Sequence, residues 1–320
     1  MSYYLDLLRQ VLFIPTPPLT EKNLENQIGR VFIVSGGYAG CGKELSKILY
    51  QHNGTVYVAG RSPEKAHKAI EEIKQAHPSS DGRVEFLKVD LADLSSIKPA
   101  VEEFMRKEQR LDVLTNNAGV MLPPAGSKDA QGYELQMGTN CLGTFLLTKL
   151  LTPLLQKTTG ASKPGSVRVT WAASLATNNA PKNGVAWDPS TGHAQNHSGQ
   201  WLNYGQSKAG NALLAKAYSD RHAKDGIVSN AWNPGNLQTE LARHTPAWQR
   251  ALLPILTYPP INGAYTELFA GWAEEPAKPE HKGAYIGPWG RFVMLRPDID
   301  NSPDTDKFWD WCDKETKTYQ

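Results

Sequence analysis

Strand-like and helix-like segments alternate through most of this chain, and that alternation restricts the possible folds more than any other feature. The run Val31–Val34 is continuously apolar, as in a strand buried on both faces of a sheet. Comparable strand-like runs follow at Val56–Ala59, Val84–Val89, Leu111–Leu114, Val167–Trp171 and Val228–Trp232. Segments with apolar residues at helical spacing separate them, the longest at 136–155 and 204–223. The pattern predicts an α/β fold, a doubly wound parallel sheet of about seven strands with helices on both faces.

A glycine-rich loop, Ser35-Gly36-Gly37-Tyr38-Ala39-Gly40-Cys41-Gly42, joins the first predicted strand to the first predicted helix. Glycines allow the backbone to turn tightly and to approach a pyrophosphate. The helix that follows offers free N–H groups and the positive end of its dipole. In this position the loop predicts a dinucleotide site, and with the alternation it predicts a single-domain Rossmann fold.

The end of the second predicted strand indicates which dinucleotide is bound. Arg61 and Ser62 stand about where an acidic residue would bind the ribose 2′-hydroxyl of NAD. Arg61 can pair instead with the 2′-phosphate of NADP, and Ser62 can donate to it. No acid occupies positions 59–63, so NADP(H) is the expected cofactor, with mixed use of NAD left open.

Tyr204 and Lys208 are four residues apart, which places both side chains on one face of a predicted helix. A phenol with an ordinary pKa near 10 is a poor acid–base group at neutral pH. A nearby ammonium stabilises the phenolate, so the spacing predicts a lowered pKa for Tyr204 and a role in proton transfer.

Over about residues 28–290 the chain resembles the short-chain dehydrogenase/reductase superfamily, whose motifs occur here in the family's order. The matching pieces are the glycine loop, Asp90-Leu91, Asn116-Asn117-Ala118-Gly119, Asn140, Ser174, Tyr204 with Lys208, and the segment 234–239. The longer loop before Tyr204 and the lead-in 18–24 are similar to the retinol-dehydrogenase-like and WW-domain-oxidoreductase-like branch, especially its fungal members.

The resemblance implies a role for each member of a catalytic tetrad. Tyr204 would exchange a proton with the carbonyl oxygen, and Ser174 would polarise that oxygen. Lys208 would bind the nicotinamide ribose and lower the pKa of Tyr204, and Asn140 would support a proton relay. The implied cofactor contacts are Ser35, Gly36, Tyr38, Gly40, Cys41, Gly42, Arg61, Ser62, Asp90, Leu91, Asn117, Ala118, Gly119, Tyr204, Lys208, Pro234, Gly235, Leu237 and Thr239.

Three segments depart from the simplest family pattern. Residues 1–27 form an N-terminal extension, and 28–320 are expected to be one catalytic domain. An insert at 175–203 is expected either to shape the substrate site or to form an exposed excursion. A second insert, 236–262, is rich in apolar residues and favours a hydrophobic ligand, although core packing explains many of the same residues.

Composition excludes several other classes of protein. The net charge of +2 gives no support for a nucleic-acid partner. Three scattered cysteines indicate no disulfide framework, and they fit a cytoplasmic protein. The isolated pair His193 and His197 does not indicate a metal site. The apolar segment 3–14 is expected to dock on the protein's own surface, with peripheral membrane contact as the alternative.

The sequence therefore predicts an NADP-dependent oxidoreductase acting on the CH–OH group of a small alcohol or on the corresponding apolar ketone or aldehyde. A ketoreductase of fungal secondary metabolism is one such enzyme. A sugar-nucleotide epimerase fits less well, because Gly36, Gly40 and Gly42 form GxxxGxG and not GxxGxxG. A non-catalytic NADP-binding regulator is the other alternative, and a homodimer is compatible with the sequence.

Overall fold

The computed structural model describes residues 3–12, 14–238 and 257–320. The described strands form a single sheet in the order β3-β2-β1-β4-β5-β6-β7-β8, in which all neighbours are parallel except β7 and β8. Their bounds are β1 Val31–Ser35, β2 Thr55–Gly60, β3 Arg83–Lys88, β4 Val113–Asn116, β5 Arg168–Ala172, β6 Val228–Trp232, β7 Tyr285–Gly287 and β8 Arg291–Phe292. The predicted α/β class and doubly wound parallel sheet are confirmed.

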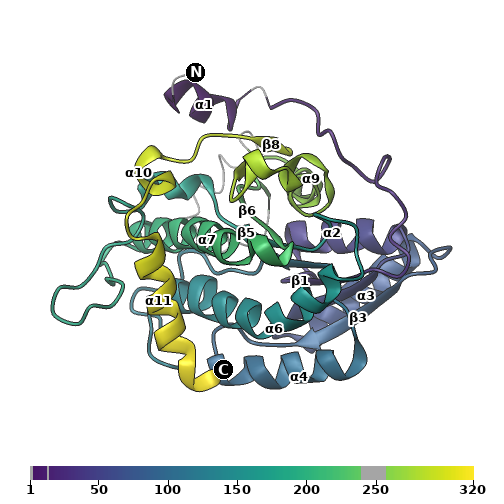
Figure 1. Cartoon of the computed structure of the whole chain (residues 1–320), viewed down its shortest axis with the longest axis horizontal. Coiled ribbons are helices and arrows are strands. Elements are labelled where there is room, and N and C mark those ends of the chain that lie inside the picture. Colours follow the sequence, from purple (N-terminus) through teal and green to yellow (C-terminus); the bar gives the residue numbers. More distant parts are fainter. Residues whose placement is uncertain (1–2, 13, 239–256) are drawn as a thin grey trace.

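Helices cover both faces of this sheet (Figure 1). Their bounds are α1 Tyr3–Arg9, α2 Gly40–Gln51, α3 Pro63–Ala76, α4 Ile97–Lys107, α5 Leu135–Met137, α6 Thr144–Thr159, α7 Gln200–His222, α9 Pro260–Trp272, α10 Pro297–Asp300 and α11 Thr305–Thr316. Figure 1 shows α9 on one side of the sheet and α4 and α6 on the other. Short helical turns at Leu94–Ser96, Leu175–Asn179 and Ala223–Asp225 complete the main connections.

Alternate residues of each strand pack into cores on opposite sides. On β1, Ile33 faces the larger core, which includes residues of α4, α6, α7 and α11. Its neighbours Phe32 and Val34 face a second core with α2 and α9. Both faces of β1 are therefore covered by apolar side chains, which explains why Val31–Val34 is a continuous apolar run.

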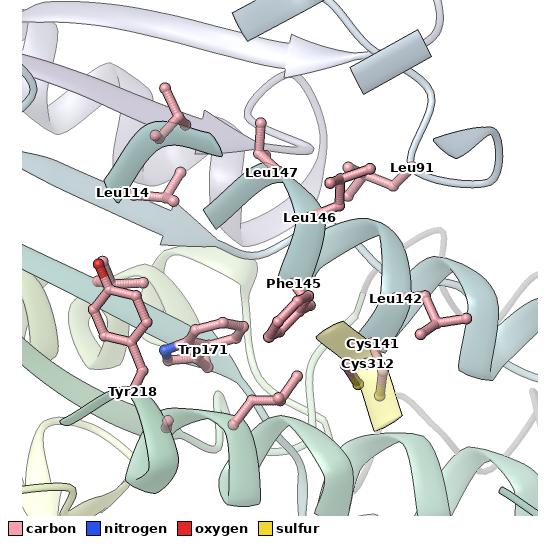
Figure 2. Close-up of a cluster of buried hydrophobic side chains, with 14 of the residues drawn as sticks. Leu91, Leu114, Cys141, Leu142, Phe145, Leu146, Leu147, Trp171, Tyr218 and Cys312 are labelled. Atoms are coloured by element: carbon pink, nitrogen blue, oxygen red, sulfur yellow. The ribbon is translucent and has the colours of Figure 1, made fainter. Parts of the chain in front are cut away.

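The larger core includes Leu114 of β4 and Trp171 of β5. Figure 2 shows Phe145 of α6 beside Trp171 of β5, with Tyr218 of α7 next to that indole. Trp171 is fully buried, and its Nε1 donates to Ser229 Oγ at 3.0 Å, so its only polar atom is satisfied. A buried aromatic ring of this kind stabilises the fold by about 3 kcal/mol, and it fixes β5 against α7, the helix that carries Tyr204 and Lys208.

The predicted helix at 136–155 is not regular at its start. Residues Gly138–Gly143 form a π-helical stretch between α5 and α6. Gly143 lies against Leu91, where an added Cβ would stand 2.2 Å from the Leu91 carbonyl oxygen. Apolar periodicity does not reveal such a stretch, although π-helical turns are frequent at functional sites. This one carries Asn140.

The order of the strands creates one reversal. The chain runs outward from β1 to β2 and β3, then returns to place β4 on the other side of β1. At such a point the loops after the two central strands diverge and leave a crevice at their carboxyl ends. The glycine loop follows β1, and Asn117-Ala118-Gly119 follows β4.

Candidate active site

A cavity of about 1360 Å³ opens at these carboxyl ends. It extends from the glycine loop and the end of β2, past Ser174 and Tyr204, to the N-terminal helix α1. Its lining includes Ser174, Tyr204, Lys208 and, of the predicted cofactor contacts, Ser35, Gly36, Tyr38, Gly40, Cys41, Arg61, Ser62, Asp90, Leu91, Asn117, Ala118, Gly119, Pro234, Gly235 and Leu237. Thr239 lies outside the described residues.

The glycine loop is shaped to admit a pyrophosphate. Gly36 has φ of +68°, which favours glycine, and its N–H donates to the Ala59 carbonyl at 2.7 Å. A Cβ on Gly42 would lie 2.5 Å from Asn117 Nδ2, which itself donates to the Ser35 carbonyl at 2.8 Å. Ala39, the residue that precedes α2, has no side-chain acceptor for the first-turn N–H groups. The helix end is thus available to an anion.

The end of β2 holds the residues expected to discriminate between NADP and NAD. Ser62 caps α3 by accepting from Lys65 N at 3.4 Å, and its own N–H donates to Tyr38 Oη at 3.4 Å. The exposed Arg61 and Lys65 both line this end of the cavity. Lys65 was not predicted from the sequence, although its position three residues after Ser62, in the first turn of α3, could have indicated a second cation near the 2′-phosphate site.

Tyr204 and Lys208 lie on α7, which begins at Gln200, a turn earlier than expected. Both side chains are buried, and Lys208 Nζ lies 5.7 Å from the centre of the Tyr204 ring. Lys208 Nζ donates to the Ala172 carbonyl at 3.0 Å, and Asn211 Nδ2 donates to the same oxygen at 2.8 Å. The last residue of β5 therefore fixes the lysine.

The electrostatics of this pair differ from the prediction. Burial raises the pKa of Tyr204 to about 12, against a smaller lowering by its hydrogen bond with Ser174. Burial also lowers the pKa of Lys208 to about 8. The net pKa of Tyr204 is thus raised and not lowered as predicted, because loss of hydration disfavours the phenolate more than the hydrogen bond with Ser174 stabilises it.

Ser174 is held by the start of the 175–203 insert. Its Oγ accepts from Ala176 N at 3.1 Å, and its carbonyl accepts from Tyr285 Oη at 3.0 Å. The first part of the insert lines the cavity through Leu175, Ala176, Asn178 and Asn179. Around Trp187 the insert packs against Phe308 and Trp311 of α11, and Trp201 near its end lines the cavity again.

Asn140 is completely buried behind Lys208. Its Oδ1 accepts from Val120 N at 2.8 Å, and its Nδ2 donates to the Val120 carbonyl and to Ser207 Oγ, each at 3.0 Å. Gly119 separates it from the lysine, since an added Cβ there would lie 3.0 Å from Asn140 Oδ1 and 3.3 Å from Lys208 Nζ. Asn140 therefore ties the loop after β4 to α7.

The N-terminal segment also contributes to the cavity wall, through Leu7, Leu8, Val11 and Leu12, and this contribution was not predicted. Trp201, within the 175–203 insert, lines the cavity too, and its ring lies 6.3 Å from that of Tyr204. The extension thus docks on the protein's own surface, as expected for residues 3–12. Most of the 236–262 insert lies outside the described residues, and only 236–238 and 257–262 can be placed.

Among residues 3–12, 14–238 and 257–320, no helix is long and apolar enough to cross a bilayer. In the same ranges no three His, Cys, Asp or Glu side chains gather as a metal site. His193 lies by Glu315, and His197 Nε2 lies 3.2 Å from Gln206 Oε1.

Comparison with known proteins gives a consistent result. The family model described as short chain dehydrogenase matches residues 30–250. A short-chain dehydrogenase/reductase of Phomopsis amygdali is 45% identical over 322 residues and covers 96% of both chains. The short-chain dehydrogenase/reductase pkfC of Emericella nidulans is 42% identical, over 95% of this chain and 97% of its own.

Solved structures share the fold. A structure of an uncharacterized protein from Mycobacterium paratuberculosis superposes with a TM-score of 0.68 at 26% identity, covering 93% of this chain and 97% of its own. The RhlG/NADP complex of Pseudomonas aeruginosa gives 0.60 at 23% identity, covering 81% and 94%.

Proposed function

This chain belongs to the short-chain dehydrogenase/reductase family, and we propose that it transfers a hydride between NADP(H) and an uncharged carbonyl or alcohol compound. The observation that carries the proposal is the convergence of Tyr204, Ser174 and Lys208 on one stretch of the cavity that also contains the glycine loop. An acid–base group and a dinucleotide cradle in one cavity are what such a reaction requires.

NADP(H) fits the residues present. The pyrophosphate would lie at the start of α2, beside Gly36 and Gly40, which line the cavity. Gly42 lets α2 pack closely on Asn117, since a Cβ there would lie 2.5 Å from its Nδ2. Arg61, Ser62 and Lys65 would bind the 2′-phosphate, since two cations and a hydroxyl suit a dianion. Asp90 and Leu91 would contact the adenine, and Pro234 and Gly235 the nicotinamide end. When bound, the cofactor supplies or accepts the hydride.

The protein's own residues would manage the proton. Ser174 Oγ would donate a hydrogen bond to the substrate's carbonyl oxygen and polarise it. Because its pKa is about 12, Tyr204 is a neutral phenol at physiological pH and so carries the proton that this oxygen needs during reduction. Lys208, with a pKa of about 8, still carries its own proton near pH 7 and would favour the phenolate left on Tyr204.

Asn140 would act on this chemistry through Lys208. Its side-chain bonds to Val120 and Ser207 hold the loop after β4 against α7. That contact would keep the lysine aligned and leave a path for a proton relay. We further propose the role of a ketoreductase in fungal secondary metabolism; the two short-chain dehydrogenase/reductase relatives named above are fungal proteins.

A screen of NADPH and NADH oxidation against ketones and aldehydes, retinal and steroid-like ketones included, tests the proposal. We expect turnover with NADPH and a much weaker affinity for NADH. Arg61→Ala should reduce the difference by about tenfold or more, the value of a charged hydrogen bond. Binding of NADPH without turnover of any carbonyl would favour the non-catalytic regulator, and equal affinities for both cofactors would contradict the assignment of Arg61.

A further inference from the structure

We propose that α1 and the residues just after it form a roof over the substrate end of the cavity, and that this roof selects carbonyl compounds with a bulky, uncharged, apolar body. We define the roof by its cavity-lining residues Leu7, Leu8, Val11 and Leu12. The proposal rests on the carbonyl chemistry proposed above, and it assigns substrate selection to a segment that lies before the first strand. In Figure 1, α1 lies at the edge of the molecule near α10 and β8.

Polar contacts hold the roof in place. An isolated helix of seven residues is unstable in water, so tertiary contacts must stabilise α1. Asp6, which is 7% exposed, accepts from Met294 N at 2.9 Å and from Gln10 Nε2 at 3.1 Å. Gln10 Oε1 in turn accepts from Asn233 Nδ2 at 3.2 Å. Tyr3 Oη donates to Asn178 Oδ1.

These contacts join α1 to both sides of the active site. Asn178 follows Ser174 in the loop after β5, and its Nδ2 donates to the Leu175 carbonyl at 2.8 Å. Asn233 follows β6, and its Oδ1 accepts from the N–H of Gly235 at 3.1 Å. The segment therefore spans from the loop of the carbonyl-polarising serine to the segment proposed to hold the nicotinamide.

The side chains of the roof are apolar although water reaches them. Leu8 is 58% exposed and Leu12 is 47% exposed, yet both line the cavity. Trp201, beside Tyr204, is also 47% exposed and lines it. An apolar ligand would bury all three, and the removal of this apolar surface from water would favour its binding.

Charge supports an uncharged ligand. Among the described lining residues the charged side chains are Arg61, Lys65, Asp90 and Lys208. The first three lie at the adenosine end, and Lys208 lies against Ala172 beneath Tyr204. The described roof and the lining residues Met121, Pro123 and Leu237 carry no charge, so a charged substrate group placed among them would lose hydration without a charged partner.

A matched pair of double variants tests the roof. Leu8→Asn with Leu12→Asn changes side chains that line the cavity. Tyr4→Asn with Leu5→Asn changes exposed apolar side chains of the same helix that are not among the cavity-lining residues. Each variant is assayed with NADPH and either decalone, a bulky apolar ketone, or diacetyl, a small one.

We expect the Leu8/Leu12 variant to lose at least about tenfold in kcat/KM for decalone, mainly through KM, because a hydrophobic pocket discriminates by about that factor per group removed. Its kcat/KM for diacetyl and its Kd for NADPH should not change, and the Tyr4/Leu5 variant should resemble the unmutated protein. Equal losses for both ketones, or in both variants, would overturn the proposal.

A second comparison tests the positioning of the roof. Asp6→Ala removes the acceptor for Met294 N, whereas Asp6→Asn retains one carbonyl oxygen. We expect Asp6→Ala to raise KM for decalone without changing kcat for diacetyl, and Asp6→Asn to restore most of the affinity. An unchanged KM for decalone in Asp6→Ala would contradict this role.

Failure of the proposed function can be recognised separately. If the unmutated protein reduces neither ketone, that function is refuted. Calorimetric binding of decalone to the protein–NADP⁺ complex then tests whether the roof binds apolar compounds. Binding that is weakened only in the Leu8/Leu12 variant would support the roof, and absence of binding would overturn it.

Discussion

Replacement of Lys208 by methionine should make the cofactor-free protein more stable while it abolishes turnover. Burial lowers the pKa of Lys208 from its ordinary value of 10.5 to about 8. Below pH 8 the lysine is charged in both the folded and the unfolded chain, and the folded chain bears the cost of burying that charge. At 1.36 kcal/mol per pH unit this cost is about 3 kcal/mol near pH 7.

The pH dependence of the effect follows from the same values. As the pH rises from about 8 toward 10.5, the folded chain loses its proton first, so the cost of the lysine declines. At pH 9.5 it should be about 1 kcal/mol. Methionine has a similar length and no charge, and the Ala172 carbonyl retains the bond from Asn211. The stability gained by Lys208→Met should therefore be largest near neutral pH.

Urea unfolding of the cofactor-free protein at both pH values, followed by tryptophan fluorescence, measures this gain. Lys216→Met provides the matched control, because Lys216 is a partly exposed lysine of the same helix and its Nζ donates to the Asp300 carbonyl at the surface. We expect a gain for Lys208→Met alone, smaller at the higher pH. Destabilisation, or a gain of equal size at both pH values, would refute the reasoning.

Two other substitutions test separate parts of the structure. Gly42→Ala should weaken NADPH binding by about tenfold or more, because its Cβ would lie 2.5 Å from Asn117 Nδ2 and an overpacked site costs about 1–3 kcal/mol. Gly160→Ala is the control. Its Cβ would meet only Lys157 O at 3.6 Å, so this variant should bind NADPH normally in the same titration. Glu267→Gln should stabilise the protein at pH 7 but little at pH 4, since burial raises the pKa of Glu267 well above its ordinary value and neither carboxyl oxygen has a described hydrogen-bond partner. An equal effect of Glu267→Gln at both pH values in urea unfolding would contradict the second prediction.

The sequence predicted those parts of the fold that repeat a simple pattern. Strands β1 to β6 were each located within about two residues. β1 is continuously apolar because both faces of the sheet are covered there. The antiparallel β8 was not foreseen, since Arg291–Phe292 is two residues long and follows Gly287, Pro288 and Gly290, whose composition indicates a turn.

The site was predictable where chemistry depends on spacing along the chain. Tyr204 and Lys208 share a helix, so four residues of separation were enough to pair them. The apolar residues of α1 could not be assigned to the cavity in the same way. Their position depends on the hydrogen bonds that Met294 N donates to Asp6 and that Asn233 donates to Gln10, and each bond joins residues more than two hundred positions apart.

The pKa of Tyr204 was predicted in the wrong direction for a related reason. Spacing identifies the neighbouring charge but not the degree of burial, and here burial has the larger effect. The same burial keeps the phenol protonated, which is the form needed to deliver a proton to a carbonyl oxygen.

Single-turnover reduction of an apolar ketone by the protein–NADPH complex, measured for the unmutated protein and for Tyr204→Phe, tests the central claim most directly. Phenylalanine keeps the ring and removes only the hydroxyl. We expect the unmutated protein to oxidise one NADPH per site and to form the alcohol. Tyr204→Phe should bind NADPH with unchanged affinity and react at least about a hundredfold more slowly, the contribution expected of a positioned proton donor. Reduction at the normal rate by Tyr204→Phe would contradict the account.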